Sequence, residues 1–336
     1  FAAGALYEAG CTGPDFLRRV HEIVADKLGL GSTKAASRYD LTVEVLEEPR
    51  VDDSSNENLQ RFNLLNRDRK KKQMPGVEYA IGGRFRIVLE SDDDLSLAAS
   101  ILAVALTLSG IGKGSRKALG SLDIVRVSGA APSRPLKELI EEIRRQMAVP
   151  RCGRPVGLPK IAAIANGVFE VYRVIVDYRR LHNIFLRSER SRLARRSGDP
   201  LDHMAWFLGL PRVGKMKVGK TFDKESKKEI ETGYLFITDD VKRRASPVFA
   251  TWHSRNHRYG YGEGGYLAIF LSQDWPSKLC WVSGKEKKQS GTDKDMCDDK
   301  KRGIPIYINE KTLNEAKSKF IDVLSQIGWR PQRIWP

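Results

Sequence analysis

The chain has 336 residues, 41% of them hydrophobic and 30% charged, and its 58 lysines and arginines against 42 acidic residues give a formal net charge of +16. The chain is long enough for two domains that each bury a core. Its apolar stretches are too short and too interrupted to span a bilayer, and no signal peptide is visible. We therefore expect a cytoplasmic protein without a membrane partner. The excess of positive charge favours a polyanionic partner, with nucleic acid as the leading candidate, because neutralised phosphates release counterions. The alternative is a surface rich in ion pairs, but so unequal a number of cations and acids fits that alternative less well.

The first half of the chain predicts two helices and three strands. The first helix carries its apolar residues on one face and ends at Gly29, whereas the second is apolar nearly all round and therefore buried. In the second strand, Arg84 and Arg86 face away from the apolar row. In chain order we expect a helix from Pro14 or Asp15 to Leu28, a strand Leu41–Leu46, a strand Tyr79–Leu89, a helix Leu95–Leu108 and a strand Leu122–Val127.

A glycine-rich loop, residues 109–121, lies between the second helix and the third strand and holds four glycines and three cations in thirteen positions. Glycine has no Cβ, so successive backbone N–H groups can turn toward one anion and a nucleic-acid backbone can approach closely. Lys113, Arg116 and Lys117 add charge without demanding any base identity. We expect a phosphate-handling loop; a flexible turn with solvated cations is the alternative.

In the second half, a linker helix begins near Ser133, and the turn-rich segment Pro150–Pro159 that follows it is expected to be a domain boundary. Five strands and a closing helix, which ends at Gly328, are expected beyond this boundary. The strands are placed near Val168–Val176, Tyr234–Thr238, Ser246–Trp252, Tyr266–Leu271 and Ile304–Ile308, and the helix at Glu310–Ile327.

Arginine is concentrated between Tyr178 and Arg196, where seven arginines, Arg179 and Arg180 among them, accompany a single acid. Arginine suits bidentate contact with phosphate and stacking on bases. Because like charges four residues apart repel, RNA or an acidic partner subunit is favoured over a solvated helix face.

Residues 214–221 have the spelling of a phosphate-binding P-loop, and residues 235–239 resemble the strand that accompanies one. A P-loop needs a buried strand before it and a packing helix after it. Here Pro211 precedes the segment and residues 222–231 are too polar to pack on a sheet, so we reject a nucleotide site.

The four cysteines, Cys11, Cys152, Cys280 and Cys297, lie far apart and form no CxxC pair. Neither the spacing of zinc ligands nor a disulfide framework is present. We therefore expect free thiols in a reducing cytosol, with neither a metal nor a cofactor.

His253 and His257 lie near arginines and tyrosines in the sequence. Such a set serves either acid–base ribonuclease chemistry or base stacking and phosphate contact. We favour the second, because nothing in the sequence supports a catalytic geometry.

Several segments resemble RAMP proteins, the RNA-binding subunits of CRISPR effector complexes. The glycine-rich loop and its flanks, from Leu106 to Leu122, are similar to theirs, and the subgroup resembled is the large two-domain RAMP that caps one end of the type III-B (Cmr) complex. Further matches, in the family's order, are Gly31-Ser32 with Ser37-Arg38, Leu208-Gly209-Leu210-Pro211 and Arg243-Arg244-Ala245-Ser246-Pro247.

The chain also departs from that family. Ser109 and Ala118 stand where the family has further glycines, and Leu30 stands where it often has phenylalanine. The strand expected ahead of the first helix is absent, so we expect that a first segment is missing.

The resemblance implies an α+β protein of two ferredoxin-like (RRM-like) domains with a helical insertion in the second. Restoring the missing strand gives the order strand, helix, strand, strand, helix, strand of a split βαβ unit. We therefore expect one domain over residues 1–131, with the glycine-rich loop at 109–121, a linker helix and turn-rich connection over 132–159, and a second domain over 160–336 with its helical insertion at about 181–208.

The resemblance further implies a non-catalytic subunit that holds crRNA, target RNA or both near the guide 3′ end in antiviral defence. Its expected partners are crRNA, target single-stranded RNA and the other RAMP subunits of the effector complex. A RAMP-type endoribonuclease that processes CRISPR RNA precursors through His253 or His257 is the alternative, and a stand-alone RRM-like regulator is a third possibility. The residues expected to bind RNA are Gly110, Gly112, Lys113, Gly114, Ser115, Arg116, Lys117, Arg84, Arg86, Arg179, Arg180, Arg243, Arg244, Ser246 and His253.

Overall fold

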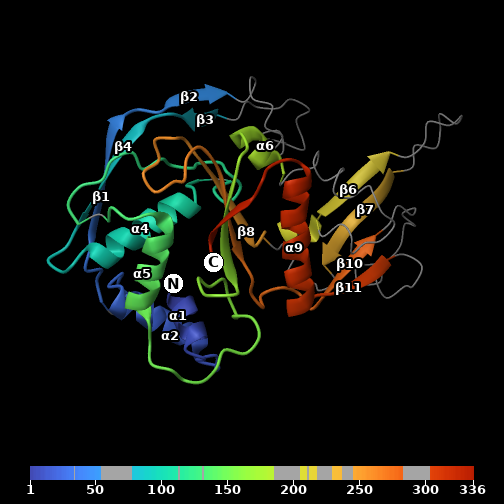
Figure 1. Ribbon diagram of the computed structural model, residues 1–336, viewed down its shortest axis with the longest axis horizontal. Coiled ribbons are helices and arrows are strands. Elements are labelled where there is room, and N and C mark those ends of the chain that lie inside the picture. The colour runs from blue at the N-terminus through green and yellow to red at the C-terminus, as the bar shows by residue number, and fades with distance from the viewer. Residues whose placement is uncertain are drawn as a thin grey trace, which may run out of the picture.

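A computed structural model describes residues 1–33, 35–53, 78–112, 114–130, 132–184, 205–209, 212–217, 229–236, 245–282 and 303–336 (Figure 1). Helices combine with small antiparallel sheets, so the fold is α+β, as predicted. The helices are α1 (Ala2–Glu8), α2 (Phe16–Glu22) with its π-helical continuation η1 (Ile23–Lys27), α4 (Ser96–Leu108), α5 (Leu136–Met147), α6 (Tyr178–Asn183), the 3-10 segment η4 (Ala205–Leu208) and α9 (Glu310–Gln326). The strands are β1 (Asp40–Glu47), β2 (Arg50–Asp53), β3 (Glu78–Ile81), β4 (Arg84–Glu90), β5 (Phe169–Val174), β6 (Arg212–Lys217), β7 (Glu229–Phe236), β8 (Val248–His253), β9 (Gly264–Phe270), β10 (Lys278–Val282), β11 (Gly303–Tyr307) and β12 (Gln332–Trp335).

The central sheet has the strand order β12-β5-β9-β8, and each neighbouring pair is antiparallel. Along the chain, α6 follows β5 and α9 precedes β12, so these elements succeed one another as strand, helix, strand, strand, helix, strand. This is the succession of a split βαβ unit. That the chain holds two ferredoxin-like domains stays a prediction.

The long helix α9 shows how sequence sets these elements. Asn309 accepts a hydrogen bond from the N–H of Thr312 and so caps the first turn (2.9 Å). The residues at helical spacing on one face are buried in the core, namely Leu313, Ala316, Phe320 and Leu324. The helices expected near residues 15–28, 95–108, 133–147 and 310–327 are all confirmed.

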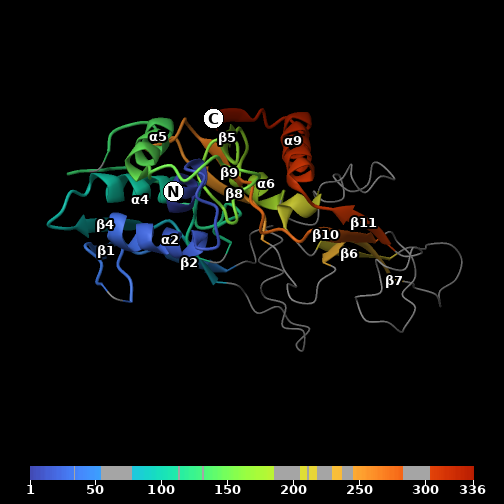
Figure 2. The same cartoon turned by 90° about the horizontal axis from the view of Figure 1, so that it is seen from below.

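A second four-stranded antiparallel sheet, of order β11-β10-β7-β6, lies beside α9 (Figures 1 and 2). Residues 214–217, the start of the P-loop spelling, lie within β6 and pair antiparallel with β7. A P-loop would place these residues in a turn between a strand and a helix. The rest of the spelling, residues 218–221, lies outside the described residues, and the rejection of a nucleotide site there stays a prediction.

The strand expected at Tyr79–Leu89 is two strands. Gly82 and Gly83, at φ of 71° and 86°, separate β3 from β4. β3 pairs with β2, whereas β4 pairs with β1. Within the second pair, Val43 lies opposite Ile87 in an apolar row that keeps the predicted alternation.

The strand expected at Leu122–Val127 is wrong. The N–H of Ile124 donates to Nδ1 of His257 (2.9 Å), and its carbonyl accepts from the N–H of Arg258 (2.8 Å). Because these backbone groups are paired with a loop, the segment joins no strand in the described ranges.

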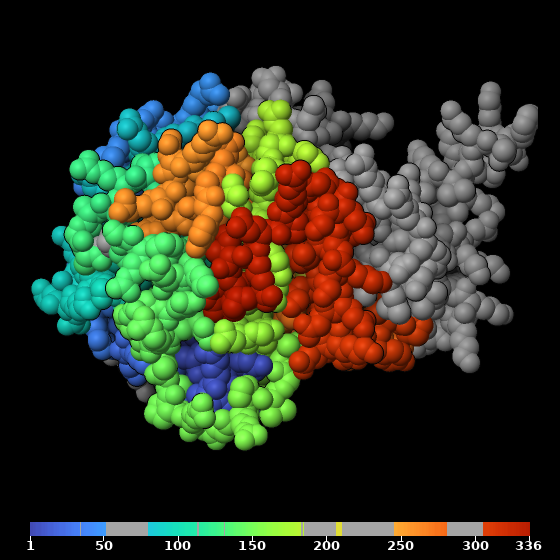
Figure 3. Space-filling model, in the orientation of Figure 1, coloured from blue at the N-terminus to red at the C-terminus, as the bar shows by residue number. Residues whose placement is uncertain are grey.

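The buried core joins both halves of the chain. Ile140 and Ile143 of α5 pack in one apolar cluster with Phe169 of β5 and Trp335 of β12. Figure 3 shows the N-terminal residues, in blue, enclosed between green residues of the central part of the chain and the red C-terminal part. A division of the chain at 132–159 stays a prediction. Of the helices described, none has the length and apolar character to cross a membrane.

The expectation of free thiols is wrong. Cys11 and Cys152, 141 residues apart, form a disulfide with a Cα–Cα distance of 5.0 Å, and Cys280 is also disulfide-bonded. Cys297 lies outside the described residues. Beside the first disulfide, the N–H of Cys152 donates to the carbonyl of Ala9 (2.7 Å), so the backbone segments that carry the two cysteines lie side by side. The spacing of the cysteines in the sequence does not reveal this contact. Structural disulfides persist in oxidising compartments and in the cells of hyperthermophiles, so the cysteines give no support to a reducing cytosol.

Candidate nucleic-acid interface

The glycine-rich loop runs along β8, which is an edge strand of the central sheet. Lys117 forms a parallel bridge with Ala250. The N–H of Ala118 donates to the carbonyl of Ala250 (2.7 Å), and the N–H of Ala250 donates to the carbonyl of Arg116 (3.1 Å). Residues 116–118 therefore extend the sheet, which fixes this half of the loop.

Two glycines form the base of the loop because no other residue fits there. A Cβ at Gly110 would lie 2.7 Å from the carbonyl oxygen of Leu119, and a Cβ at Gly120 would lie 2.0 Å from that of Ile111. These surroundings give Gly110 a packing role, and RNA contact by Gly110 stays a prediction. Ala118, where the resembled family has glycine, also adopts a left-handed φ of 61° and is buried.

Gly112 and Gly114 form the turn of the loop, at φ of 75° and 93°. Gly112 is exposed at the open end of this turn, whereas Gly114 is half-buried and a Cβ there would lie 2.9 Å from Cδ1 of Leu119. Nothing lies within 4 Å of a Cβ placed at Gly112. The N–H groups of both glycines have no hydrogen-bond acceptor in the part of the chain that the structure describes. Lys113, between them, lies outside the described residues. Neighbouring N–H groups in a left-handed turn are suited to bind an anion.

Arg116 is held against the protein. Its guanidinium lies 3.9 Å from the centre of the Phe249 ring and donates to the carbonyl of Ser246 (3.0 Å). Ser246 is only 4% exposed, and its hydroxyl accepts from the N–H of Val248 at the start of β8 (3.0 Å). The Ser246 side chain is therefore enclosed by the protein, and Arg116 attaches the loop to β8. RNA contact by Ser246 and by Arg116 stays a prediction.

Ser115 and Lys117 are half-buried. The carbonyl of Ser115 accepts from the N–H of Gly110 (3.2 Å), which closes the turn. The carbonyl of Lys117 lies 2.7 Å from Nδ1 of His182 in α6, so the loop contacts α6 as well as β8. RNA contact by these two residues stays a prediction.

Arg84 and Arg86 are exposed on the β1–β4 pair, and each faces a carboxylate across the two strands. Arg84 donates to Glu47 (2.7 Å) and Arg86 donates to Glu44 (2.7 Å). Exposed ion pairs contribute little to stability, so an RNA phosphate can compete for either arginine.

Arg179 and Arg180 are exposed on α6, next to the loop. The Nε–H of Arg179 donates to the hydroxyl of Tyr178 (3.0 Å), and the Arg180 guanidinium lies 6.0 Å from the centre of the Trp329 ring. Arg243 and Arg244 lie outside the described residues, as do residues 185–204 of the expected insertion.

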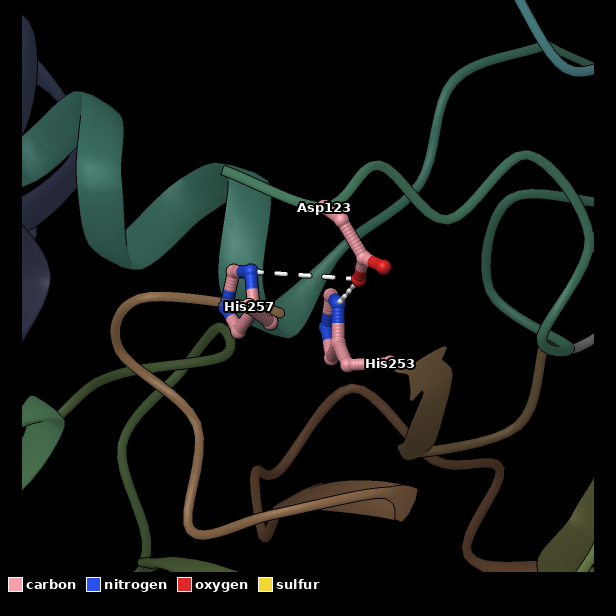
Figure 4. Close-up of side chains that lie close together, drawn as sticks. All are labelled: Asp123, His253 and His257. Carbon is pink, nitrogen blue, oxygen red and sulfur yellow. Dashed lines mark hydrogen bonds and ion pairs between the residues drawn. The ribbon is translucent and has the colours of Figure 1, made fainter. Parts of the chain in front are cut away.

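His253 is fully buried and both of its ring nitrogens face oxygen acceptors, one of which, on Asp123, is drawn in Figure 4. Nδ1 lies 3.0 Å from Oδ1 of Asp123, and Nε2 lies 2.8 Å from the carbonyl oxygen of Thr107. A doubly protonated ring satisfies both acceptors. The ring is enclosed by the protein, and RNA contact by His253 stays a prediction.

The ring of His257 stacks on that of His253, with centroids 3.9 Å apart. Its Nδ1 accepts from the N–H of Ile124. Its Nε2 lies 3.1 Å from the Thr107 hydroxyl, which already donates to the carbonyl of Ala103 and so must accept from the imidazole. Burial and the charge of His253 lower the pKa of His257 to about 3, so the ring is neutral with its proton on Nε2.

Asp123 completes a cluster that could not be predicted from sequence, since it lies 130 residues from His253. Burial alone raises the pKa of this carboxyl, but hydrogen bonds from His253 and Ser254 outweigh burial and lower the pKa to about 2. Asp123, His253 and His257 bring three potential metal-ligand atoms within 4.8 Å of one another. The Nδ1 lone pair of His257, however, already accepts from the N–H of Ile124. The three side chains therefore form a hydrogen-bonded link between the segment that follows the loop and β8.

No family model matches the chain, and no curated protein matches it significantly. Among solved structures, it is similar to the apo form of Cmr1 from Pyrococcus furiosus, with 19% identity, a TM-score of 0.47, and coverage of 100% of this chain and 90% of that chain. It is also similar to the Type III-B Cmr-beta bound to cognate target RNA and AMPPnP in the presence of ssDNA, with 12% identity, a TM-score of 0.40, and coverage of 96% and 91%.

Proposed function

We propose that the protein is a non-catalytic RNA-binding subunit of a type III-B CRISPR effector complex, which holds crRNA, target RNA or both near the guide 3′ end in antiviral defence. One observation carries the RNA-binding part: Gly112 and Gly114 have backbone N–H groups without an acceptor among the described residues, in a chain of net charge +16. The effector complex, its sister subunits and a pair of ferredoxin-like domains come from the resemblance of the loop and of segment 243–247 to RAMP proteins.

In this proposal the loop binds sugar and phosphate. Main-chain N–H groups and cations fix the position of a strand but carry no sequence information, which base pairing between guide and target supplies. The exposed arginines of α6 add positive charge beside the loop, and Arg84 and Arg86 of the β1–β4 pair can exchange their carboxylate partners for phosphates.

A non-catalytic role is favoured over the endoribonuclease by the state of the two histidines. Both ring nitrogens of His253 and of His257 are engaged within the protein, and neither ring is exposed enough to meet a substrate ribose. A general base must lie within hydrogen-bond reach of the proton that it removes.

The test is to express the chain with the sister subunits of its native host, isolate the assembly and sequence the bound RNA. We expect crRNA and the sister subunits to co-purify. Gly112→Val should reduce the RNA recovered, because a β-branched side chain opposes a φ of 75° and fills the open turn. Gly167→Val is the matched control, since Gly167 has a φ of 77° and equally open surroundings but lies outside the loop.

The same preparation is incubated with labelled repeat RNA without metal. We expect no cleavage. Site-specific cleavage that is lost in His253→Ala would favour the endoribonuclease, and purification without crRNA or sister subunits would favour the stand-alone regulator.

A further inference from the structure

We propose that Arg126 and Arg258 bind two phosphates of a single-stranded RNA that also contacts the glycine-rich loop. This inference depends on the RNA-binding function proposed above and adds a second contact area to it. The two arginines lie at the far end of a seam, by which we mean the contacts that residues 116–124 make with residues 250–258.

The seam connects the glycine-rich loop to this contact area. At one end, Lys117 of the loop forms a parallel bridge with Ala250 of β8. At the other end, the carbonyl of Ile124 accepts from the N–H of Arg258 in the loop that follows β8 (2.8 Å). The two segments therefore run side by side in the same direction, and a strand that leaves the glycine-rich loop along the seam meets Arg258.

Buried side chains fix the seam between its two ends (Figure 4). Nδ1 of His253 lies 3.0 Å from Oδ1 of Asp123, and the ring of His257 stacks on that of His253 and accepts from the N–H of Ile124 (2.9 Å). The doubly protonated His253 ring balances the charge of the Asp123 carboxylate. The carboxylate of the seam therefore opposes an incoming phosphate only weakly.

Arg258 is exposed between two anchored neighbours. His257 and Tyr259 are buried on either side of it, and the Tyr259 hydroxyl donates to the carbonyl of Pro132 (2.7 Å). The Arg258 guanidinium donates to the hydroxyl of Ser133 (3.2 Å). The backbone at this position is thus held before RNA arrives, so little conformational freedom is lost on binding.

Arg126 is exposed two residues beyond Ile124. Two residues of extended chain span at most about 7 Å, and Ile124 is hydrogen-bonded to Arg258. The long side chains of the two arginines can therefore reach phosphates of the same strand.

The charges around the two arginines are unequal. The other arginines of these segments, Arg134 and Arg255, each pair with a glutamate at 3.4 Å. Arg126 and Arg258 face no carboxylate in the part of the chain that the structure describes. Binding of a phosphate to them releases counterions from the RNA and breaks no ion pair, so it adds affinity without base preference.

The first variant combines Arg126→Gln with Arg258→Gln. A competing explanation is that Arg258 only links its loop to Ser133. Ser133→Ala tests this explanation, because it removes the hydroxyl that accepts from the guanidinium and leaves the positive charge in place. Thermal unfolding establishes that the variants are folded.

The matched control combines Arg151→Gln with Arg154→Gln. Both arginines are exposed in the turn-rich segment Pro150–Pro159, and their loss lowers the net charge by the same amount. Figure 3 shows this segment, in bright green, at the lower edge of the molecule and the loop between β8 and β9, in orange, at the upper left. The control therefore separates a local phosphate contact from a general effect of charge.

Kd for a single-stranded oligoribonucleotide is measured by fluorescence anisotropy from 50 to 200 mM salt. Each phosphate contact on a single strand contributes about 0.7 to the slope of log K against log salt, so the double variant Arg126→Gln/Arg258→Gln should have a slope shallower by about 1.4. Its Kd should rise roughly tenfold at 200 mM salt and more at 50 mM. Ser133→Ala and the matched control should bind like the wild type.

The proposal is overturned if the double variant keeps the Kd and slope of the wild type, or if the matched control loses the same factor. Should the double variant not fold, Arg126→Gln alone decides, with a slope shallower by about 0.7 expected and an unchanged slope contradicting the proposal. Unchanged RNA binding together with loss of the co-purifying sister subunits would assign the two arginines to an acidic protein surface instead. Failure of the RNA-binding function itself is a different outcome, in which the wild type does not bind the RNA.

Discussion

The guanidinium of Arg116 lies 3.9 Å from the centre of the Phe249 ring, so one cation of the glycine-rich loop also attaches the loop to β8. Arg116→Ala removes this contact and the hydrogen bond to the Ser246 carbonyl, and should lower the free energy of unfolding by about 1–3 kcal/mol. Chemical denaturation measures the change. Arg116→Lys should recover only part of it, because an ammonium lacks the planar fork. An unchanged denaturation midpoint in Arg116→Ala would show that the contact is not stabilising.

The glycines of the loop should differ in their sensitivity to substitution. A Cβ at Gly120 meets the carbonyl oxygen of Ile111, so Gly120→Ala should destabilise the fold well beyond the roughly 1 kcal/mol of a left-handed alanine. A Cβ at Gly112 meets nothing within 4 Å, so Gly112→Ala should lower the free energy of unfolding by no more than this backbone cost. Thermal unfolding of the two variants compares them directly. Equal losses would contradict the distinction between the base of the loop and its open turn.

The disulfide Cys11–Cys152 closes a loop of 141 residues around the first part of the chain. Cys11→Ser together with Cys152→Ser should lower the free energy of unfolding by about 2–5 kcal/mol, chiefly because the unfolded chain regains freedom. Denaturation of oxidised protein and of the double variant gives this difference. Adding reductant to the double variant controls for Cys280, which is also disulfide-bonded. If the double variant matches oxidised wild type, the disulfide does not stabilise the fold.

Stability should depend on pH through His257. Burial and the charge of His253 lower its pKa from 6.5 to about 3, so between these values the unfolded chain binds a proton that the folded protein does not. The free energy of unfolding therefore falls as the pH falls from 6.5 toward 3, with a slope that corresponds to the uptake of at most one proton on unfolding. Asp123 contributes in the same direction, but only as the pH falls from 3.8 toward 2.

The variant His257→Gln isolates the histidine. Its denaturation midpoint should change less than that of the wild type between about pH 7 and pH 5, where Asp123 stays ionised in both states. An identical change in both proteins would mean that His257 titrates normally in the fold.

Periodicity in the sequence was sufficient to predict the elements that bury one face, such as α5, α9, β5 and β9. It failed where backbone groups pair outside regular structure: Ile124 has strand-like neighbours in the sequence but binds His257 and Arg258. It also missed β6, β10 and β12, which are short and carry weak patterns.

Residue type predicted the glycine-rich loop but not the surroundings of its neighbours. His253 and Ser246 have the chemistry of RNA ligands, and only the tertiary structure shows that both are buried. Likewise, a histidine at position 253 gives no sign of a carboxylate 130 residues earlier in the chain. These contacts arise from the packing of the loop on β8, which sequence spacing does not encode.

We propose above all that the chain binds single-stranded RNA mainly through phosphate contacts. The most direct test is the Kd of the full chain for RNA strands of different base composition, measured from 50 to 200 mM salt. If about six phosphates are neutralised, log K should fall linearly with log salt with a slope near −4, a loss of a few hundredfold over this range, with similar slopes for every strand. Failure to bind single-stranded RNA at the lowest salt, or an affinity that does not change with salt, would contradict the account.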